Sequence, residues 1–229
     1  MKRGPILILT GLLLLLPGGI EAQVDRGPGQ TLPRQHPPTL QQNGARLADL
    51  RRRLLELDRL LALQSVARAE SLLEDLAQHS ALARDLISRR IRLAQLRGDH
   101  PRAVALCRDA VISQPLNPAL WRSMASSLLA IDQPDSARLA ADMFMATSPT
   151  VRSAGMVAVE LFQMAEHPRI SLGIIDSLRV EMADPRYMGR QRAVCLVQIG
   201  QLDKAADEVV AELRFNPFNV SLLRTDLLE

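Results

Sequence analysis

The sequence predicts an all-α protein built from repeated helix hairpins, and three observations carry this prediction. Beyond residue 43, Ala, Leu and Arg dominate, and apolar residues recur three and four positions apart, which is the spacing of amphipathic helices. The same part of the chain shows no strand-like alternation. Residue types also recur there at a fixed interval, the mark of a repeat architecture. With 229 residues, 47% of them hydrophobic, and a net charge of +3, disorder throughout is excluded.

Residues 1–22 are predicted to be a secretory signal peptide. Lys2 and Arg3 precede an apolar stretch from Ile6 to Leu16, and Ala22 offers a small residue for cleavage. A membrane-spanning helix needs about 20 apolar residues, and this stretch ends sooner, at Pro17. The protein is therefore expected to be exported, either periplasmic or secreted. The alternative is an uncleaved segment that anchors the N-terminus in a membrane.

Residues 23–42 are predicted to form a disordered linker, because proline and glycine crowd into them. Residues 43–229 are predicted to form the helical repeat domain. Lys2 and Lys204 are the only lysines in a chain with 28 basic residues. An exported protein with this bias toward arginine is expected in a bacterial periplasm or envelope.

The interval of the repeat is 34 residues. One series of small residues keeps this interval without slippage: Ala69, Ala103, Ala137, Ser171 and Ala205. A larger, mostly apolar series keeps it as well: Leu60, Ala94, Leu128, Phe162 and Leu196. Five units follow, at 50–83, 84–117, 118–151, 152–185 and 186–219. The small series is explained by packing, since two antiparallel helices approach closely only where one contributes little side chain.

Each unit is expected to be a helix hairpin. The turns between its two helices are predicted from glycine, proline and acidic residues at 98–101, 132–134, 166–168 and 200–203. Asn117-Pro118 combines an N-cap with proline at the first helical position, so it opens the third unit. The second helix of that unit should end near Ser148-Pro149. Asp184-Pro185 is predicted to cap the first helix of the fifth unit in the same way as Asn117-Pro118.

At these positions the chain resembles the tetratricopeptide repeat (TPR), a 34-residue helix hairpin. The third unit carries the pattern as Trp121, Met124, Ala125, Leu128, Ala137, Ala141 and Pro149. The fifth carries it as Ala193, Leu196, Gly200, Ala205 and Pro217. Gly155 and Gly189 depart from it, because they stand where the third unit has Trp121. The resemblance covers about residues 50–219 and implies a right-handed superhelical solenoid of TPR-like helix hairpins.

The resemblance implies a binding scaffold whose first helices line a concave groove. It predicts a protein or peptide partner on that face. The alternative is a regulatory or assembly subunit of an envelope enzyme or secretion complex. The family's groove positions fall on Arg92, Gln95, Arg122, Met156, Glu160, Gln163, Met164, Tyr187 and Arg190. Arginine suits carboxylates and methionine suits adaptable apolar contacts, although the same residues could also be ordinary solvated side chains.

No catalytic, metal-binding or cofactor-binding residue is predicted. The four histidines lie apart from one another and from carboxylates at metal-ligand spacing: His36, His79, His100 and His167. A glycine-rich phosphate loop and a nucleophile elbow are both missing from the sequence. We therefore expect a protein that is not an enzyme. A net charge of +3 is too small to predict nucleic-acid binding, and membrane contact is expected only through an uncleaved N-terminal segment.

Two further expectations concern the cysteines and the C-terminus. Cys107 and Cys195 fall in the second and fifth units, too far apart for a disulfide if repeats contact only their neighbours. Both are expected to be small buried residues. Residues 220–229 contain four leucines that should dock on Val209, Val210 and Leu213 as the start of a sixth first helix. The leucine surface left open predicts self-association, a continuation of the chain or a covering partner.

Overall fold

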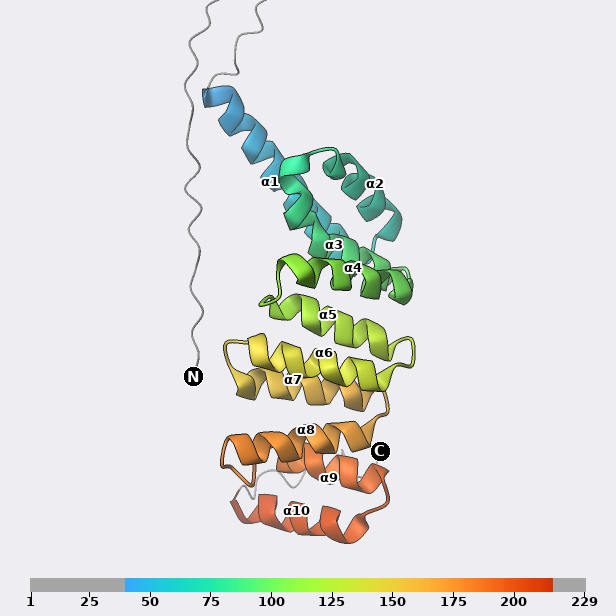
Figure 1. The fold of residues 1–229 in the computed structure, drawn as a ribbon, viewed down its shortest axis with the longest axis vertical. Coiled ribbons are helices and arrows are strands. Elements are labelled where there is room, and N and C mark those ends of the chain that lie inside the picture. Colours follow the sequence, from blue (N-terminus) through green and yellow to red (C-terminus); the bar gives the residue numbers. More distant parts are fainter. Residues whose placement is uncertain (1–39, 216–229) are drawn as a thin grey trace, which may run out of the picture. The chain divides into compact units, whose positions relative to one another are not determined.

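The computed structural model describes residues 40–215 of the chain (Figure 1). The predicted signal peptide, almost all of the predicted linker and the segment 220–229 lie outside the described residues. Within the described part the ordered elements are helices, so the predicted all-α class is confirmed. They are α1 (Leu40–Ala62), α2 (Val66–Ala77), a short 3-10 turn (Ser80–Leu82), α3 (Ala83–Leu96), α4 (His100–Ser113), α5 (Pro118–Leu129), α6 (Pro134–Thr147), α7 (Val151–Met164), α8 (Pro168–Glu181), α9 (Gly189–Gln198) and α10 (Leu202–Phe215).

Most helix ends fall where the turn chemistry predicts them. The Asn117 side chain accepts a hydrogen bond from the Ala119 N–H at 3.1 Å, which caps the start of α5. Asp99 caps α4 in the same way, with its carboxylate 3.2 Å from the Arg102 N–H. At the other end of the sequence, α1 begins at Leu40, so the last residues of the predicted linker are helical.

Left-handed turns recur every 34 residues and show the repeat in the backbone itself. In each hairpin one residue after the first helix has positive φ: Gln64, Gly98, Asp132, Glu166 and Gly200. The next N–H then donates to a carbonyl five residues earlier, as from Asp99 to Ala94 at 2.9 Å. The same bond is present after every one of these residues. Residues 40–215 therefore form five helix hairpins, and the turn of each one, including the first, falls at the same position within its 34-residue unit.

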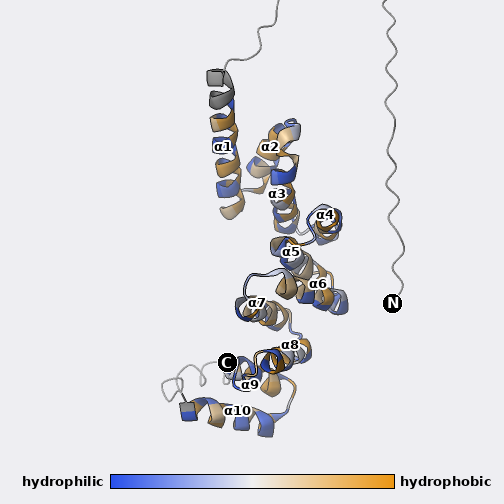
Figure 2. Ribbon diagram, turned by 60° about the vertical axis from the view of Figure 1, so that its left-hand side comes forward, coloured by the Kyte–Doolittle hydropathy of each residue, from blue (hydrophilic) through white to orange (hydrophobic). Residues whose placement is uncertain are grey.

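From α2 onward, consecutive helices lie side by side and bury a core between them (Figure 1). The helices are amphipathic, as the blue and orange stretches along α1, α2 and α10 show in Figure 2. The small residues of the 34-residue series are all buried, at 3% exposure or less: Ala69, Ala103, Ala137, Ser171 and Ala205. Their predicted place at the crossing of two close helices agrees with this burial.

The predicted start of one helix is wrong. Asp184-Pro185 does not open α9, because the chain runs through a turn and becomes helical only at Gly189. The Asp184 carboxylate instead accepts a hydrogen bond from the Arg186 N–H within that turn, at 3.1 Å. Met188, just before α9, is left-handed with φ 56°. The turn is fixed by Tyr187, whose ring is buried in the core, so helical geometry begins only after it.

Packing also explains the glycine at position 155. A Cβ atom built on Gly155 would lie 2.4 Å from Leu178 Cδ1, far inside van der Waals contact. A larger residue at 155 would therefore require the end of the Leu178 side chain to move. At the position that holds Trp121 in the third unit, the fourth unit thus has glycine packed against this leucine.

Both cysteines are free and buried, as the sequence predicted. Burial raises the pKa of the Cys107 thiol from 9.0 to about 12. None of the helices between residues 40 and 215 is long and apolar enough to cross a membrane.

Candidate partner-binding face and cavities

The predicted groove residues divide by exposure into two groups. Five are exposed on the first helices of their hairpins: Arg92, Arg122, Met156, Glu160 and Met164. Four are partly or fully buried: Gln95, Gln163, Tyr187 and Arg190. The exposed group is free to meet a partner, whereas the second group already packs within the protein.

Gln95 and Gln163 join consecutive hairpins. The Gln95 amide donates to Ser127 Oγ on α5 at 3.0 Å. Two units further on, the Gln163 amide lies 3.2 Å from Cys195 Sγ on α9. In each case the side chain reaches from one first helix to the next. Their amides hold the array together, so their main role is structural.

Tyr187 is a core residue rather than a groove residue. Its ring is 6% exposed, its hydroxyl donates to the Arg152 carbonyl at 2.6 Å, and the Arg152 guanidinium lies 4.7 Å from the ring centroid. Burial raises the pKa of the phenol, and the nearby arginine partly opposes this. The prediction placed Tyr187 in the groove because it assumed a helix from Pro185 onward.

A cavity of about 530 Å³ lies between the ends of α5 and α7, and we call it the α5–α7 cavity. Its apolar lining includes Leu129, Leu161 and Met164, and Met164 is 85% exposed. Asp132 and Glu166 bring carboxylates to its rim from the two left-handed turns. Neither carboxylate has an ion-pair partner among the residues that the structure describes. Ser126 and His167 line it as well, so the cavity mixes apolar and polar surface, and its two carboxylates suit a ligand that carries a basic group beside an apolar one.

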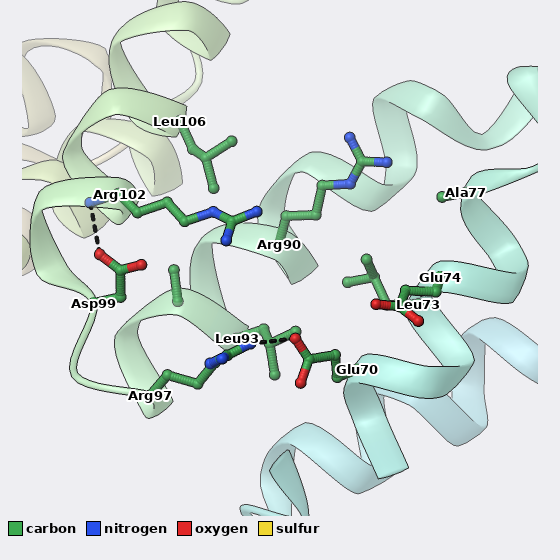
Figure 3. A pocket seen from close by; sticks show the side chains of 11 residues that line it. Glu70, Leu73, Glu74, Ala77, Arg90, Leu93, Arg97, Asp99, Arg102 and Leu106 are labelled. Carbon is green, nitrogen blue, oxygen red and sulfur yellow. Dashed lines mark hydrogen bonds and ion pairs between the residues drawn. The ribbon is translucent and has the colours of Figure 1, made fainter. Parts of the chain in front are cut away.

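A second cavity, of about 260 Å³, lies between α2, α3 and α4, and we call it the charged cavity (Figure 3). Leucine side chains from all three helices line it: Leu73, Leu93 and Leu106. Three arginines and three acidic residues surround these leucines: Arg90, Arg97, Arg102, Glu70, Glu74 and Asp99. The first two hairpins both contribute residues to its lining. No local sequence motif indicates such a site, so the sequence did not predict it.

The charges of this cavity are unevenly paired. Arg97 forms an ion pair with Glu70, and Asp99 caps α4. Arg90 and Arg102 have no ion-pair partner within residues 40–215. Figure 3 shows Arg90 on α3 and Arg102 on α4 among the side chains that line the cavity, with their guanidinium groups pointing in different directions. The cavity therefore presents two cationic groups above an apolar floor.

Within the described part of the chain, no group of three or more His, Cys, Asp or Glu side chains is placed to hold a metal ion. Burial raises the pKa of both cysteine thiols, which disfavours their thiolate form. The cavities offer apolar surface and charged groups.

Fold and cavities together define the class of the protein as an all-α array of helix hairpins. Comparison with known proteins does not narrow this class further: no protein-family model, curated protein or solved structure matches the chain.

Proposed function

We propose that the protein is an exported, TPR-like scaffold, a right-handed superhelical solenoid that binds a protein or peptide partner along its first helices. The α5–α7 cavity is the observation that carries this proposal. It lies between the ends of two successive first helices, and one of the predicted groove residues, Met164, lines it. Five hairpins in one 34-residue phase support the solenoid, because stacking of equal units produces an extended concave surface.

Met164 is the main apolar contact in this proposal. A methionine that is 85% exposed beside a cavity keeps a flexible, polarisable side chain in water. Covering it with a partner removes that apolar surface from water, worth roughly 1.5–3 kcal/mol for a fully buried side chain. Methionine also adapts to partners of different shape, which suits a peptide-binding surface.

The rim sets the charge of the partner. Asp132 and Glu166 flank the apolar lining, and each lies in a tight turn that fixes its backbone. A peptide with an arginine or lysine next to apolar residues can pair with these carboxylates and cover the apolar lining at the same time. We therefore assign a basic, apolar peptide segment to this site.

Export is proposed from residues 1–22, whose pattern of charge and hydropathy is that of a signal peptide. In that case the partner belongs to the periplasm, the envelope or the exterior of the cell. A single partner held in fixed stoichiometry identifies an assembly or regulatory subunit, and many unrelated peptides identify a general binder.

Selection from a library of random peptides on the immobilised full chain tests the peptide-binding proposal. Selected peptides are then measured by fluorescence anisotropy against two variants, Met164→Ala and Leu139→Ala. Leu139 is the matched control, because it is 70% exposed on α6 and does not line the α5–α7 cavity. We expect Met164→Ala to weaken binding about tenfold, the equivalent of ~1.4 kcal/mol. Leu139→Ala should change it less than twofold.

The selected peptides should also be enriched in arginine and lysine, and Asp132→Asn should weaken them. Peptides that bind Met164→Ala as tightly as the unaltered protein place the groove elsewhere. Failure to select any peptide counts against the scaffold function itself.

A further inference from the structure

The charged cavity has an equivalent three units further along the chain. Helices α2, α3 and α4 correspond to α8, α9 and α10, because positions 102 residues apart are separated by three intervals of 34. The two junctions therefore share one topology: the second helix of one hairpin and both helices of the next. They differ in the start of the middle helix, since α3 begins at Ala83 whereas α9 begins at Gly189, and they also differ in their side chains.

At the α8–α9–α10 junction, a buried carboxylate fills the space between the helices. Glu208 accepts two hydrogen bonds from Arg179, at 2.9 and 2.8 Å, and a third from Arg192 at 2.6 Å. Arg192 also donates to Asp176 at 2.9 Å. The Glu208 side chain is only 15% exposed. One carboxylate thus joins two arginines from neighbouring helices.

The equivalent junction in the second unit keeps one cation and its acidic neighbour. Arg90 stands 102 residues before Arg192, and Glu74 stands 102 residues before Asp176. Both Arg90 and Glu74 line the charged cavity. Unlike Arg192, Arg90 has no ion pair among the described residues.

The same junction lacks the central carboxylate. Leu106 stands at the position of Glu208, and Ala77 stands at the position of Arg179. Both replacements are residues of the cavity lining. The cavity therefore occupies the space where the other junction holds a glutamate and a long arginine. Arg90 is left without the acceptor that its counterpart has.

The repeat framework does not require these arginines. The positions 34 residues after Arg90, Arg97 and Arg102 hold Met124, Ile131 and Ser136. Hairpins of this kind therefore pack with apolar or small residues there. Arg90 is partly buried and has no ion pair among the described residues, so it gains from an anion that comes from outside the chain, and the exposed Arg102 is available to the same anion.

We propose that the charged cavity binds the carboxylate of an amphipathic ligand, and that this carboxylate takes the place that Glu208 takes at the equivalent junction. Arg90 and Arg102 donate charge-assisted hydrogen bonds to it. The apolar part of the ligand lies on Leu73 and Leu93. A cavity of about 260 Å³ has room for one acidic group and a short apolar neighbour.

The remaining rim charge favours a monoanion. Glu74 has no ion-pair partner among residues 40–215 and lines the same cavity, so its charge opposes a second negative charge beside Arg90. Asp99 also keeps its charge while it caps α4, so three arginines and three carboxylates line the cavity, and a singly charged ligand disturbs this balance less than a doubly charged one. A dianionic phosphate fits this balance less well. This site is separate from the α5–α7 cavity, so the inference does not depend on the proposed scaffold function.

The test follows the arginine side-chain Nε–Hε signals of the full chain by nuclear magnetic resonance. Three probes are titrated: acetyl-Leu-Glu-Leu-amide, its glutamine analogue and hexanoate. The glutamate peptide should shift the signals of Arg90 and Arg102, which are assigned by their loss in the Arg90→Gln and Arg102→Gln variants. The glutamine analogue should bind at least tenfold more weakly, because it lacks the charge.

Leu106→Glu is the sharpest variant, because it supplies the missing carboxylate from within the chain. It recreates the arrangement around Glu208, so it should remove binding of the glutamate peptide while the protein stays folded. Arg90→Gln should also weaken binding at least tenfold. Arg108→Gln, an exposed arginine of α4 outside the cavity lining, is the matched control and should bind as the unaltered protein does.

The probes also distinguish two sources of the ligand. Binding of the peptide alone indicates an acidic segment of a protein partner, and binding of hexanoate as well indicates that a free amphipathic carboxylate suffices. Both outcomes support a carboxylate site. Equal binding of the glutamate and glutamine peptides, or unchanged binding in Leu106→Glu, overturns the proposal. So does the absence of any shift with all three probes.

Discussion

Arg179 on α8 holds Glu208 on α10 through two parallel hydrogen bonds of 2.9 and 2.8 Å, and both side chains are largely buried, at 12% and 15% exposure. This bidentate pair joins helices of different hairpins across α9. Arg192 binds the same carboxylate from α9. Burial alone would lower the pKa of Arg192, but its pairs with Asp176 and Glu208 outweigh this and raise the pKa. The last hairpin is thus attached by charge as well as by apolar contact.

Replacing Glu208 should destabilise the C-terminal end of the array. Glu208→Gln keeps the shape of the side chain but removes the charge that two arginines share. Breaking a buried ion pair typically costs about 3–5 kcal/mol, and partial exposure here reduces the expected loss to ~2–3 kcal/mol. Urea denaturation followed by circular dichroism measures this loss. Asp207→Asn, an exposed neighbour on α10, should stay within about 0.5 kcal/mol. Equal effects of the two variants would show that the pair contributes nothing.

Replacing a left-handed residue with glycine should stabilise a hairpin turn. Glu166 has φ 59°, a conformation that is unfavourable for residues with a Cβ atom by roughly 1–2 kcal/mol. Glu166→Gly should therefore raise the melting temperature, with a gain of about 0.5–1 kcal/mol after the flexibility of glycine in the unfolded chain is deducted. Ala165→Gly is the control, since Ala165 has φ −91° and gains nothing from glycine. A higher melting temperature for Ala165→Gly than for Glu166→Gly would contradict this explanation.

Enlarging a crossing residue should be far more damaging than truncating an exposed one. Ala137 is 0% exposed, so Ala137→Leu forces extra methylene groups into a packed crossing, at a cost of about 1–3 kcal/mol. Arg92 is exposed on α3, and Arg92→Ala should change stability by about 0.5 kcal/mol or less. Thermal denaturation of the two variants compares them directly. Similar losses in both would mean that the crossing tolerates a larger side chain.

The buried thiols should be unreactive in the folded protein. Cys107 has a pKa near 12, and burial also raises the pKa of Cys195. A disulfide reagent that titrates thiolates should therefore react with neither of the 2 cysteines at pH 8. In denaturant it should react with both. Rapid reaction of the native protein would show that the hairpins around a thiol open readily.

The raised pKa of Cys107 also makes stability depend on alkaline pH. Below the ordinary value of 9.0 the thiol is protonated in both the folded and the unfolded chain, so its contribution to stability is complete. Between pH 9.0 and about 12 the unfolded chain loses this proton first, and the contribution falls as the pH rises. Cys107→Ala should make the alkaline loss of stability smaller. If the free energy of unfolding falls equally with pH in the unaltered protein and in Cys107→Ala, the loss comes from other groups.

The sequence by itself predicted the helical class, the 34-residue phase and most of the hairpin turns. These features depend on local chemistry that repeats along the chain. Asn117 and Asp99 are N-caps whose effect extends over one helical turn. Gly98 and Gly200 stand where the backbone is left-handed, and a small residue such as Ala137 is needed at each crossing. Because these residues recur every 34 positions, each unit gives independent evidence for the same helix and turn positions.

Tertiary structure alone decided where the partly buried polar side chains go. Tyr187 turns into the core, although a regular helix would have carried it to the groove. The charged cavity depends on side chains from three helices, whereas at the equivalent junction Glu208 pairs with Arg179 and Arg192. The physical reason is the separation along the chain of the residues that interact. Helix caps and turns act within a few residues of the chain, whereas the pairing of a charge depends on which side chains from distant positions reach the same point in space.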